Sequence, residues 1–446
     1  MTTLPPAPSL RVHGARAIVV DADTVRTGDL VIEGARVAEA SDLRTVDTLD
    51  ADGGIITAGL VNAHHHLLQS GFRTLPGTRG VPMAAWLPAM AAAYSTAGMD
   101  AELFGVCAEV AVAEGLLSGV TTVADHHLNW PHGAPIEETV DIARAIATSA
   151  ARLGGRLVYV RGSARDDADW AGASAEAIAV SLLADGHDGG VTADGMLQYA
   201  VGPAGVHSDG EATFAALGAV AARWGLRRRT QANEQVDVAI ALDRYGRRPI
   251  DLLEEWGWLA DDVTIAHLVD ITDHERRRIA AAGVTATHAP GCDVPMGWGV
   301  ARVADLLDAG IATGLGTSGG GSNDAGHLLA DARLALQVSG LTGRPLAAAS
   351  VIDMATRGSA RGLGRPELGH LAPGAAADFC VWDVSGVADA GVADPIAGLL
   401  WASPGRRPRH VVVAGRVVVR DYRLVTADEH DITARMSHLL AERAAR

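Results

Sequence analysis

Residues 58–365 alternate between two patterns of hydrophobic and polar positions, one typical of strands and one typical of helices. Apolar, β-branched runs of about five residues are separated by longer stretches that carry helix signals. In the clearest unit, Asp100 is an N-cap residue for a helix over 102–117, Gly119 ends that helix, and Val120 to Val123 form a strand. This alternation is typical of βαβ units and predicts a parallel α/β barrel.

Two further units support this interpretation. Thr272 and Glu275 have the spacing of a capping box, and the helix that they begin precedes a strand over 284–287. Residues 302–310 then read as a helix, and 311–316 as the next strand. We expect all of these strands to belong to one sheet.

Both ends of the chain have a different pattern, with short strands and Asp or Gly turns in place of helices. The predicted strands cover 17–20, 30–32 and 36–40 near one end, and 378–383, 410–413 and 416–420 near the other, where Ala414-Gly415 forms a turn. The chain therefore predicts a (β/α)₈ TIM barrel over 58–365 and a β-sandwich domain built jointly from 1–57 and 366–446.

Composition narrows the class of partner and the site chemistry. Net charge is -16, which disfavours nucleic acid and anionic membranes as partners and favours a small molecule. All basic residues are Arg, so a Schiff-base lysine, a P-loop lysine and a carboxylated lysine between two metals are excluded. A metal site would hold one ion at most.

Cysteine usage and the absence of apolar segments bear on location. Cys107, Cys292 and Cys380 lie far apart without CxxC spacing, which indicates neither a disulfide framework nor a zinc ribbon. No charged leader followed by an apolar stretch, and no apolar run of 18 residues, is found. We expect a cytoplasmic protein.

Polar residues gather directly after the apolar runs, where barrel enzymes carry their chemistry. These positions are His64–His66, Asp125–His127, Gln231–Glu234, His267, His288 and Ser318–Asp324. His64 and His66 are two residues apart on a strand, so both point into the barrel while His65 faces the helices. Two imidazoles at this spacing are a candidate ligand pair for zinc or iron, or else ordinary core histidines.

Several motifs together resemble one family. They are Gly59–His66, the Thr121-Thr122-Val123 strand that ends in paired histidines, Leu242–Trp258, Ser322-Asn323-Asp324, Gly369–Gly374 and Ala377-Asp378. Nearly the whole chain is similar to the amidohydrolase superfamily, in its branch of 8-oxoguanine deaminases and triazine hydrolases. The resemblance implies the barrel, the sheet made from both termini, and hydrolysis of a nitrogen-rich heterocycle such as a guanine, pterin or triazine ring.

The resemblance also implies a set of site residues. His64, His66 and His267 match the family's histidines, and Glu234 matches the glutamate of its HxxE motif. Two positions depart from the pattern. Gln231 stands where the family has a strand-five histidine, and Ser318 stands where it has the aspartate after strand eight.

These departures affect the implied mechanism directly. In the family the metal polarises water, the aspartate takes a proton from it, and the glutamate protonates a ring nitrogen so that ammonia can leave. Gln231 offers only a neutral oxygen, and Ser318 neither ligates strongly nor acts alone as a base at pH 7. Either one metal ion remains on His64, His66 and His267, with help from Gln231, or the site holds none.

Other residues are candidates for catalysis or substrate contact. Glu234, His267, Ser318 and His288 are the candidate catalytic residues, by position at strand ends. The candidate substrate contacts are Gln69, Trp86, His127, His207 and Gln231. For His288 and Trp86, a purely structural role is an equal alternative.

Three hypotheses follow from these residues. The chain is a mononuclear hydrolase that deaminates or otherwise hydrolyses a heterocycle, or a metal-independent lyase or isomerase that uses Glu234 and the histidines, or a non-catalytic protein that binds a heterocycle. Gln231 and Ser318 could also be deliberate changes made to trap a substrate. Kinship suggests a homo-oligomer.

Overall fold

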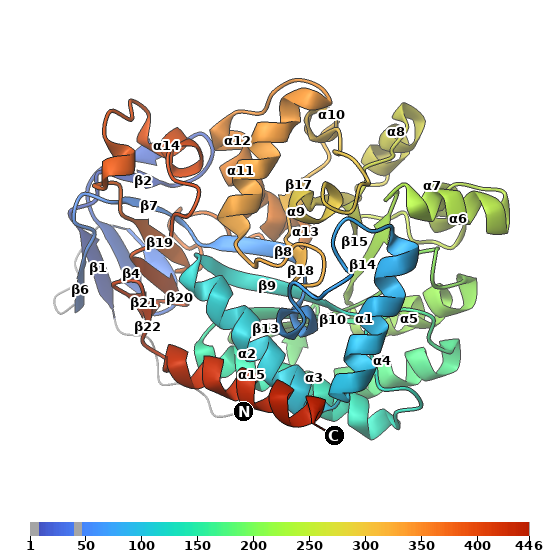
Figure 1. The fold of residues 1–446 in the computed structure, drawn as a ribbon. Coiled ribbons are helices and arrows are strands. Elements are labelled where there is room, and N and C mark those ends of the chain that lie inside the picture. The colour runs from blue at the N-terminus through green and yellow to red at the C-terminus, as the bar shows by residue number, and fades with distance from the viewer. Residues whose placement is uncertain (1–8, 40–46, 446) are drawn as a thin grey trace.

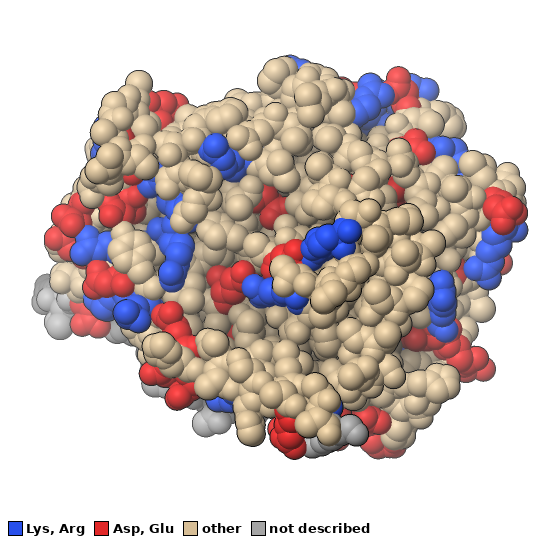
Figure 2. All heavy atoms as spheres, viewed as in Figure 1, with Lys and Arg blue, Asp and Glu red and all other residues tan. Residues whose placement is uncertain are grey.

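The computed structural model describes residues 9–39 and 47–445. Figure 1 shows an α/β fold in which the N-terminal and C-terminal strands lie together at one side. The helix-flanked parallel sheet fills the rest of the molecule. Basic side chains are interspersed with acidic ones on the face shown in Figure 2.

The central sheet curls until its two ends approach each other. Apart from a hairpin of β11 (His187–Asp188) and β12 (Val191–Thr192), its strands follow the order β17-β16-β15-β14-β13-β10-β9-β8-β18. The bounds are β8 (Leu60–His66), β9 (Val120–His127), β10 (Arg156–Ser163), β13 (Leu197–Pro203), β14 (Arg227–Ala232), β15 (Val263–His267), β16 (Thr285–His288), β17 (Thr313–Leu315) and β18 (Ser318–Gly319).

The sheet curls because its last two strands, β17 and β18, pair with different neighbours. β17 pairs with β16, and β18, which begins just beyond Thr317, pairs with β8 in parallel. One stretch of chain thus contacts both the first strand and the seventh. This curled parallel sheet is consistent with the TIM-barrel-like fold that the sequence predicts.

Helices follow the strands as the sequence units predict. Asp100 accepts a hydrogen bond of 2.9 Å from the N–H of Leu103 and caps α2, and Thr272 and Glu275 form the capping box of α8. The bounds along the barrel are α1 (Met83–Ala97), α2 (Ala101–Leu117), α3 (Ile136–Leu153), α4 (Ala168–Leu182), α5 (Glu211–Trp224), α6 (Val236–Tyr245), α7 (Pro249–Glu255), α8 (Asp273–Ala281), α9 (Pro290–Asp293), α10 (Val303–Asp308), α11 (Leu328–Val338), α12 (Ala348–Asp353) and α13 (Ser359–Gly362). Within the described residues, no helix has the length and apolar character needed to cross a membrane.

The termini build two further sheets. The four-stranded sheet has the order β5-β4-β1-β6, and the seven-stranded sheet has the order β22-β21-β20-β19-β7-β2-β3, which mixes strands from both ends of the chain. Their bounds are β1 (Leu10–His13), β2 (Ala17–Val19), β3 (Val25–Arg26), β4 (Leu30–Glu33), β5 (Arg36–Ala38), β6 (Asp47–Asp50), β7 (Ile55–Ala58), β19 (Phe379–Trp382), β20 (His410–Val413), β21 (Arg416–Arg420) and β22 (Arg423–Leu424). The predicted terminal strands are confirmed, except that β5 ends at Ala38 and Ala40 lies outside the described residues.

One cluster of buried side chains joins the two terminal sheets. Val12 and Ile32 come from the four-stranded sheet, and Ile56, Phe379 and Val412 come from the seven-stranded one. In the chain, α14 (Pro395–Trp401) lies between β19 and β20. The last helix, α15 (Glu429–Ala444), follows β22 and packs along α2 (Figure 1). Burial of this shared cluster fixes the two chain ends to each other.

A buried ion pair ties the parallel sheet to the terminal sheet. Arg156, at the start of β10, donates to both carboxylate oxygens of Asp378, over 2.7 and 3.0 Å. The two side chains are 4% and 3% exposed. Asp378 also accepts a hydrogen bond from the N–H of Ala414, so one carboxylate orders the β19 start and the turn after β20.

We expect Arg156→Met to lower the free energy of unfolding by about 3–5 kcal/mol, because it leaves the Asp378 charge buried without its partner. Denaturant unfolding measures the change. Arg223→Met is the matched control, since its pair with Glu176 is largely exposed and contributes below about 1 kcal/mol. Equal effects for the two variants would contradict the assigned role of the buried pair.

Candidate functional site

A cavity of about 460 Å³ opens at the carboxyl ends of the parallel strands. Most residues that the sequence singles out line it. They are His66, Gln69, Trp86, His207, Gln231, Glu234, His267 and Ser318. The parallel sheet is the cause, because it aligns the carboxyl ends of strands that are far apart in sequence.

The histidines of β8 lie close to His126 of β9 and His267 of β15, and His66 and His267 line the cavity. The ring centroid of His64 lies 4.9 Å from that of His66, 5.3 Å from that of His267 and 5.7 Å from that of His126. The His66 Nδ1–H donates to the carbonyl of His126 over 2.7 Å, which leaves the lone pair on its Nε2. Burial lowers the pKa of His66 to about 4 despite that hydrogen bond, so His66 is neutral.

His267 is held by a carboxylate that the sequence reasoning missed. Its Nδ1 lies 2.6 Å from Oδ1 of Asp293, and its Nε2 lies 3.2 Å from Oε1 of Gln231 and 3.7 Å from Glu234. Burial alone would lower the pKa of His267, but the charge and hydrogen bond of Asp293, together with the charge of Glu234, raise it to about 9. Both ring nitrogens of His267 therefore carry protons and donate at neutral pH.

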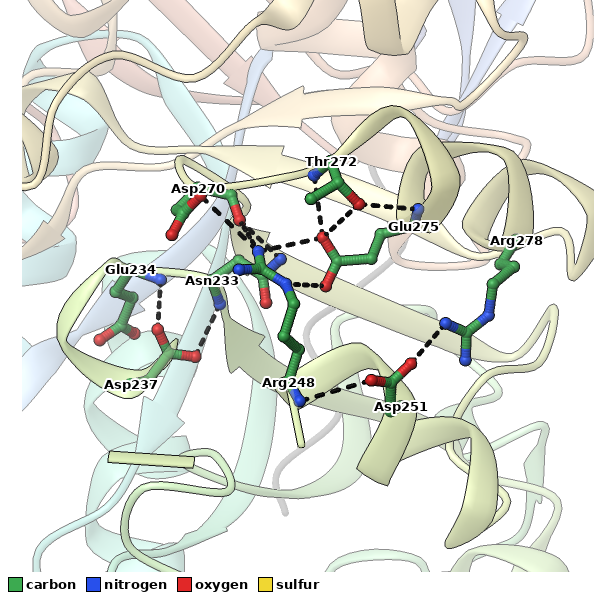
Figure 3. Close-up of polar contacts among 9 residues, drawn as sticks. All are labelled: Asn233, Glu234, Asp237, Arg248, Asp251, Asp270, Thr272, Glu275 and Arg278. Atoms are coloured by element: carbon green, nitrogen blue, oxygen red, sulfur yellow. Dashed lines mark hydrogen bonds and ion pairs between the residues drawn. The ribbon is translucent and has the colours of Figure 1, made fainter. Parts of the chain in front are cut away.

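Glu234 lies on a tight loop after β14 that a single side chain holds. Asp237 accepts the N–H of Asn233 over 2.7 Å and the N–H of Glu234 over 2.5 Å (Figure 3). Asn233 and Gln235, on either side of Glu234, have φ of 59° and 74°, which non-glycine residues rarely adopt. This strained loop turns the carboxyl group of Glu234 toward the cavity.

The Glu234 carboxyl group is buried, and neither oxygen has a hydrogen-bond partner among the described residues. Figure 3 shows that the backbone N–H of Glu234 is held by Asp237, while its carboxyl group has no hydrogen bond or ion pair with the other residues drawn. Burial raises the pKa of Glu234 to about 8, and the positive charge of His267 offsets part of the rise. Glu234 is thus a proton donor at neutral pH with no protein acceptor.

A second layer supports this loop from behind. The Asn233 amide donates to the carbonyl of Asp270 over 2.9 Å, and Arg248 donates to the same carbonyl over 2.6 Å. Arg248 also pairs with Glu275 at 2.8 Å, whose carboxylate closes the capping box with Thr272 (Figure 3). The helix cap predicted from sequence therefore helps to position Glu234.

The other predicted contacts surround the ring-sized space. The Trp86 indole N–H donates to the carbonyl of Gly321 over 2.9 Å, and Gln69 accepts the N–H of Gly321 over 3.0 Å. Their polar atoms thus hold the loop after β18, while their remaining surfaces line the cavity. Ser318, the first residue of β18, has φ of 55°. Burial lowers the pKa of His207 to about 4.

Three of the predicted site residues, His64, His127 and His288, do not line the cavity. His127 packs among the rings of Phe104, Trp130 and Tyr159, at centroid distances of 4.8, 4.5 and 5.6 Å. The structure thus places His127 away from the cavity, because alternate residues of β9 point in opposite directions and His126 is the one that faces the other histidines. His288 lies behind the cavity, with Nδ1 3.7 Å from Oδ2 of Asp293.

Sequence reasoning also missed part of the wall. Cys292, Met296 and Trp298 line the cavity, and the Trp298 ring centroid lies 5.3 Å from that of His267. Asp293, 0% exposed, follows His288 by only a few residues. The position of this carboxylate, just after a predicted strand end, was the feature of the sequence that could have identified Asp293 as a candidate site residue.

Comparison with known proteins decides the family. The model of the Amidohydrolase family matches residues 55–418. This chain belongs to the amidohydrolase family. It is 32% identical to the 8-oxoguanine deaminase of Pseudomonas aeruginosa over 408 residues, which cover 87% of this chain and 88% of the relative.

Other relatives agree on a hydrolase. The amidohydrolase is 30% identical over 431 residues, 94% of each chain, to the 5-methylthioadenosine/S-adenosylhomocysteine deaminase of Natronomonas pharaonis. The atrazine chlorohydrolase TrzN of Arthrobacter aurescens TC1, complexed with zinc, superimposes with a TM-score of 0.87 at 34% identity, over 97% of this chain and 100% of TrzN. The prediction of a hydrolase of this branch is confirmed.

Zinc in TrzN supports a divalent metal in this family, but the side chains of this chain fit one poorly. Residues 9–39 and 47–445 contain no group of three or more His, Cys, Asp or Glu side chains arranged to hold a metal ion. His64 and His66 remain as a pair, and Nε2 of His64 has no hydrogen-bond partner. Gln231 and Ser318 add only neutral oxygens, and His267, whose Nδ1 is held by Asp293, could offer only its Nε2.

We expect Asp237→Asn to lower the free energy of unfolding by about 1–3 kcal/mol, because an amide oxygen replaces only one of the two acceptors for the Asn233 and Glu234 N–H groups. Thermal or denaturant unfolding measures it. Asp243→Asn is the control on the same helix, at an exposed position. The loop is not held as described if both variants unfold like the parent.

Proposed function

We propose that this amidohydrolase removes an amino group, by hydrolysis, from a nitrogen-rich heterocycle of purine, pterin or triazine type. One observation carries the proposal: Glu234 is a buried, protonated carboxyl group whose oxygens have no hydrogen-bond partner among the described residues, in the lining of a cavity of about 460 Å³. The 8-oxoguanine and 5-methylthioadenosine deaminases among its relatives support the reaction class.

The walls of the cavity suit a flat ring. Trp86, Tyr94 and Met296 line it together with Trp298, and they offer apolar and aromatic surface. Among the polar groups of the lining, Glu234, His267 and Gln231 lie next to one another. This division orients a heterocycle with its ring nitrogens toward the acids and its flat faces against apolar side chains.

Glu234 and the histidines supply the proton transfers that deamination needs. Glu234 gives its proton to a ring nitrogen, which makes the adjacent ring carbon open to attack by water. A proton from the water passes through Nε2 of His66 to the amino group, and ammonia leaves as the C–N bond breaks. The second proton of the water returns to Glu234 as the ring carbonyl forms, so the residues end as they began.

His267 is proposed to hold the substrate rather than to exchange protons. Asp293 fixes its orientation through Nδ1, and the N–H at Nε2 faces Gln231 and Glu234. A cationic donor there stabilises negative charge that builds up on the oxygen added to the ring. Ser318, at the same end of the cavity, supplies a hydroxyl group for the same oxygen.

The domain division is part of this proposal. We infer that residues 58–365 form the catalytic (β/α)₈ barrel and that 1–57 with 366–446 form a β-sandwich beside it. The buried cluster shared by the two terminal sheets supports the sandwich. The pairings of β17 with β16 and of β18 with β8 support a closed barrel.

A panel of aminopurines, aminopterins and amino-triazines tests the reaction. At least one ring should release one ammonia for each ring carbonyl formed, as measured by a coupled ammonia assay and mass spectrometry. Conversion of a ring without ammonia would favour the metal-independent lyase or isomerase. Thermal stabilisation by a ring without any turnover would favour the non-catalytic binding protein.

With a turned-over ring in hand, Glu234→Gln should lower kcat by about 10²–10⁴-fold and change KM little, because the amide keeps the shape but cannot protonate a ring nitrogen. Steady-state kinetics measures both constants. Glu255→Gln, at an exposed position, is the control and should retain the parent kcat. A Glu234→Gln variant with parental kcat would remove Glu234 from the mechanism.

A further inference from the structure

Arg229 is a buried cation beneath the histidine cluster, and the proposed reaction does not use it. It lies on β14 two residues before Gln231, so its side chain points to the same side of the sheet, one layer deeper in the barrel. The side chain is 3% exposed. Burial and the charge of Arg227 lower its pKa to about 9, and the guanidinium remains protonated at neutral pH.

No acidic side chain in 9–39 or 47–445 forms an ion pair with this charge. Arg229 donates through Nη2 to the carbonyl of Ala63, the residue before His64, and its Nε has no hydrogen-bond partner. Among the described residues it forms no ion pair, although most buried arginines elsewhere in the chain do, such as Arg156 with Asp378 and Arg161 with Asp166. An unpaired buried charge costs free energy, so its retention calls for a reason.

The guanidinium acts on the residues that would hold a metal. Its bond to Ala63 places it against the backbone of the His64–His66 strand. After burial and the neighbouring histidines, the charge of Arg229 is one of the causes that lower the pKa of His64. A divalent cation on His64 and His66 would meet the same repulsion, twice as strongly and in a medium of low dielectric constant.

The acids of the site do not offset that repulsion. Asp293 is bonded to His267, and the oxygens of Glu234 lie nearest to His267 at 3.7 Å. Gln231 and Ser318 bring no charge. Arg229 therefore gives the site a fixed positive charge. Gln231 and Ser318 provide neutral oxygens at two positions where a metal ion would need an anionic or imidazole ligand.

We propose that this active site works without a resident divalent metal ion, and that Arg229 helps to exclude one. Gln231 and Ser318 withhold two ligands, while Arg229 supplies permanent positive charge below His64 and His66. This inference concerns the donor set and its charge, and it stands whether or not the proposed deamination is found.

Metal content tests the proposal without relying on activity. Untagged protein is incubated with excess zinc and, separately, with ferrous iron, dialysed extensively, and measured by inductively coupled plasma mass spectrometry. We expect far less than one ion per chain in both cases. One retained zinc or iron per chain would overturn the proposal.

Variants separate the effect of the two missing ligands from the effect of the Arg229 charge. Gln231→His with Ser318→Asp restores two ligands, and adding Arg229→Met removes the charge. Zinc titration by calorimetry should show affinity rising at the double variant and again, by about tenfold or more, at the triple variant. Arg228→Met, added to the double variant instead, is the control, since Arg228 pairs with Asp262 on the other side of the strand.

Two outcomes of this series would contradict a role for Arg229. One is equal zinc affinity in the double and triple variants, and the other is an equal gain from the Arg228→Met control. Circular dichroism and melting temperature establish that each variant is folded before titration. If the triple variant fails to fold, the metal content of the parent protein still decides whether the site holds an ion.

Discussion

The site depends on the pairing of one short segment with the first strand of the sheet. Ser318 and Gly319 pair with His65 and His66, while β17, just before them, pairs with β16. Thr317, between the two, hydrogen-bonds to Asn62 and His65 at 2.7 and 2.9 Å. Without these contacts the first and last strands would separate, and His66, Glu234 and His267 would not share a cavity.

Strain concentrates where this geometry is needed. Ser318 and His267 have φ of 55° and 78°, and Asn233 and Gln235 beside Glu234 have positive φ as well. Each such residue costs free energy that the surrounding packing must provide. At Glu234, hydrogen bonds offset this cost. Asp237 accepts two backbone N–H groups of the loop, and the Arg248–Glu275 pair supports the loop from behind.

The charges of the site form one connected system. Asp293 makes His267 a cation, His267 faces Glu234, and Arg229 adds a positive charge below His64 that no acid balances. The centre that we propose, which works without a resident metal ion, differs in this respect from TrzN, whose structure contains zinc. The two substitutions seen in the sequence, Gln231 and Ser318, fit that change as parts of one altered centre rather than as isolated losses.

Local rules in the sequence determined the elements and several site residues. Apolar runs, the Asp100 cap and the Thr272–Glu275 capping box predicted strands and helices that the structure contains, because these signals act over a few residues. Strand ends likewise pointed to Glu234, His267 and Ser318. Only the tertiary structure decided which side each residue of β9 faces, that Asp293 holds His267, and that Arg229 lies unpaired beneath His64. Those facts depend on sheet curvature and on partners far away in the chain, which no local pattern encodes.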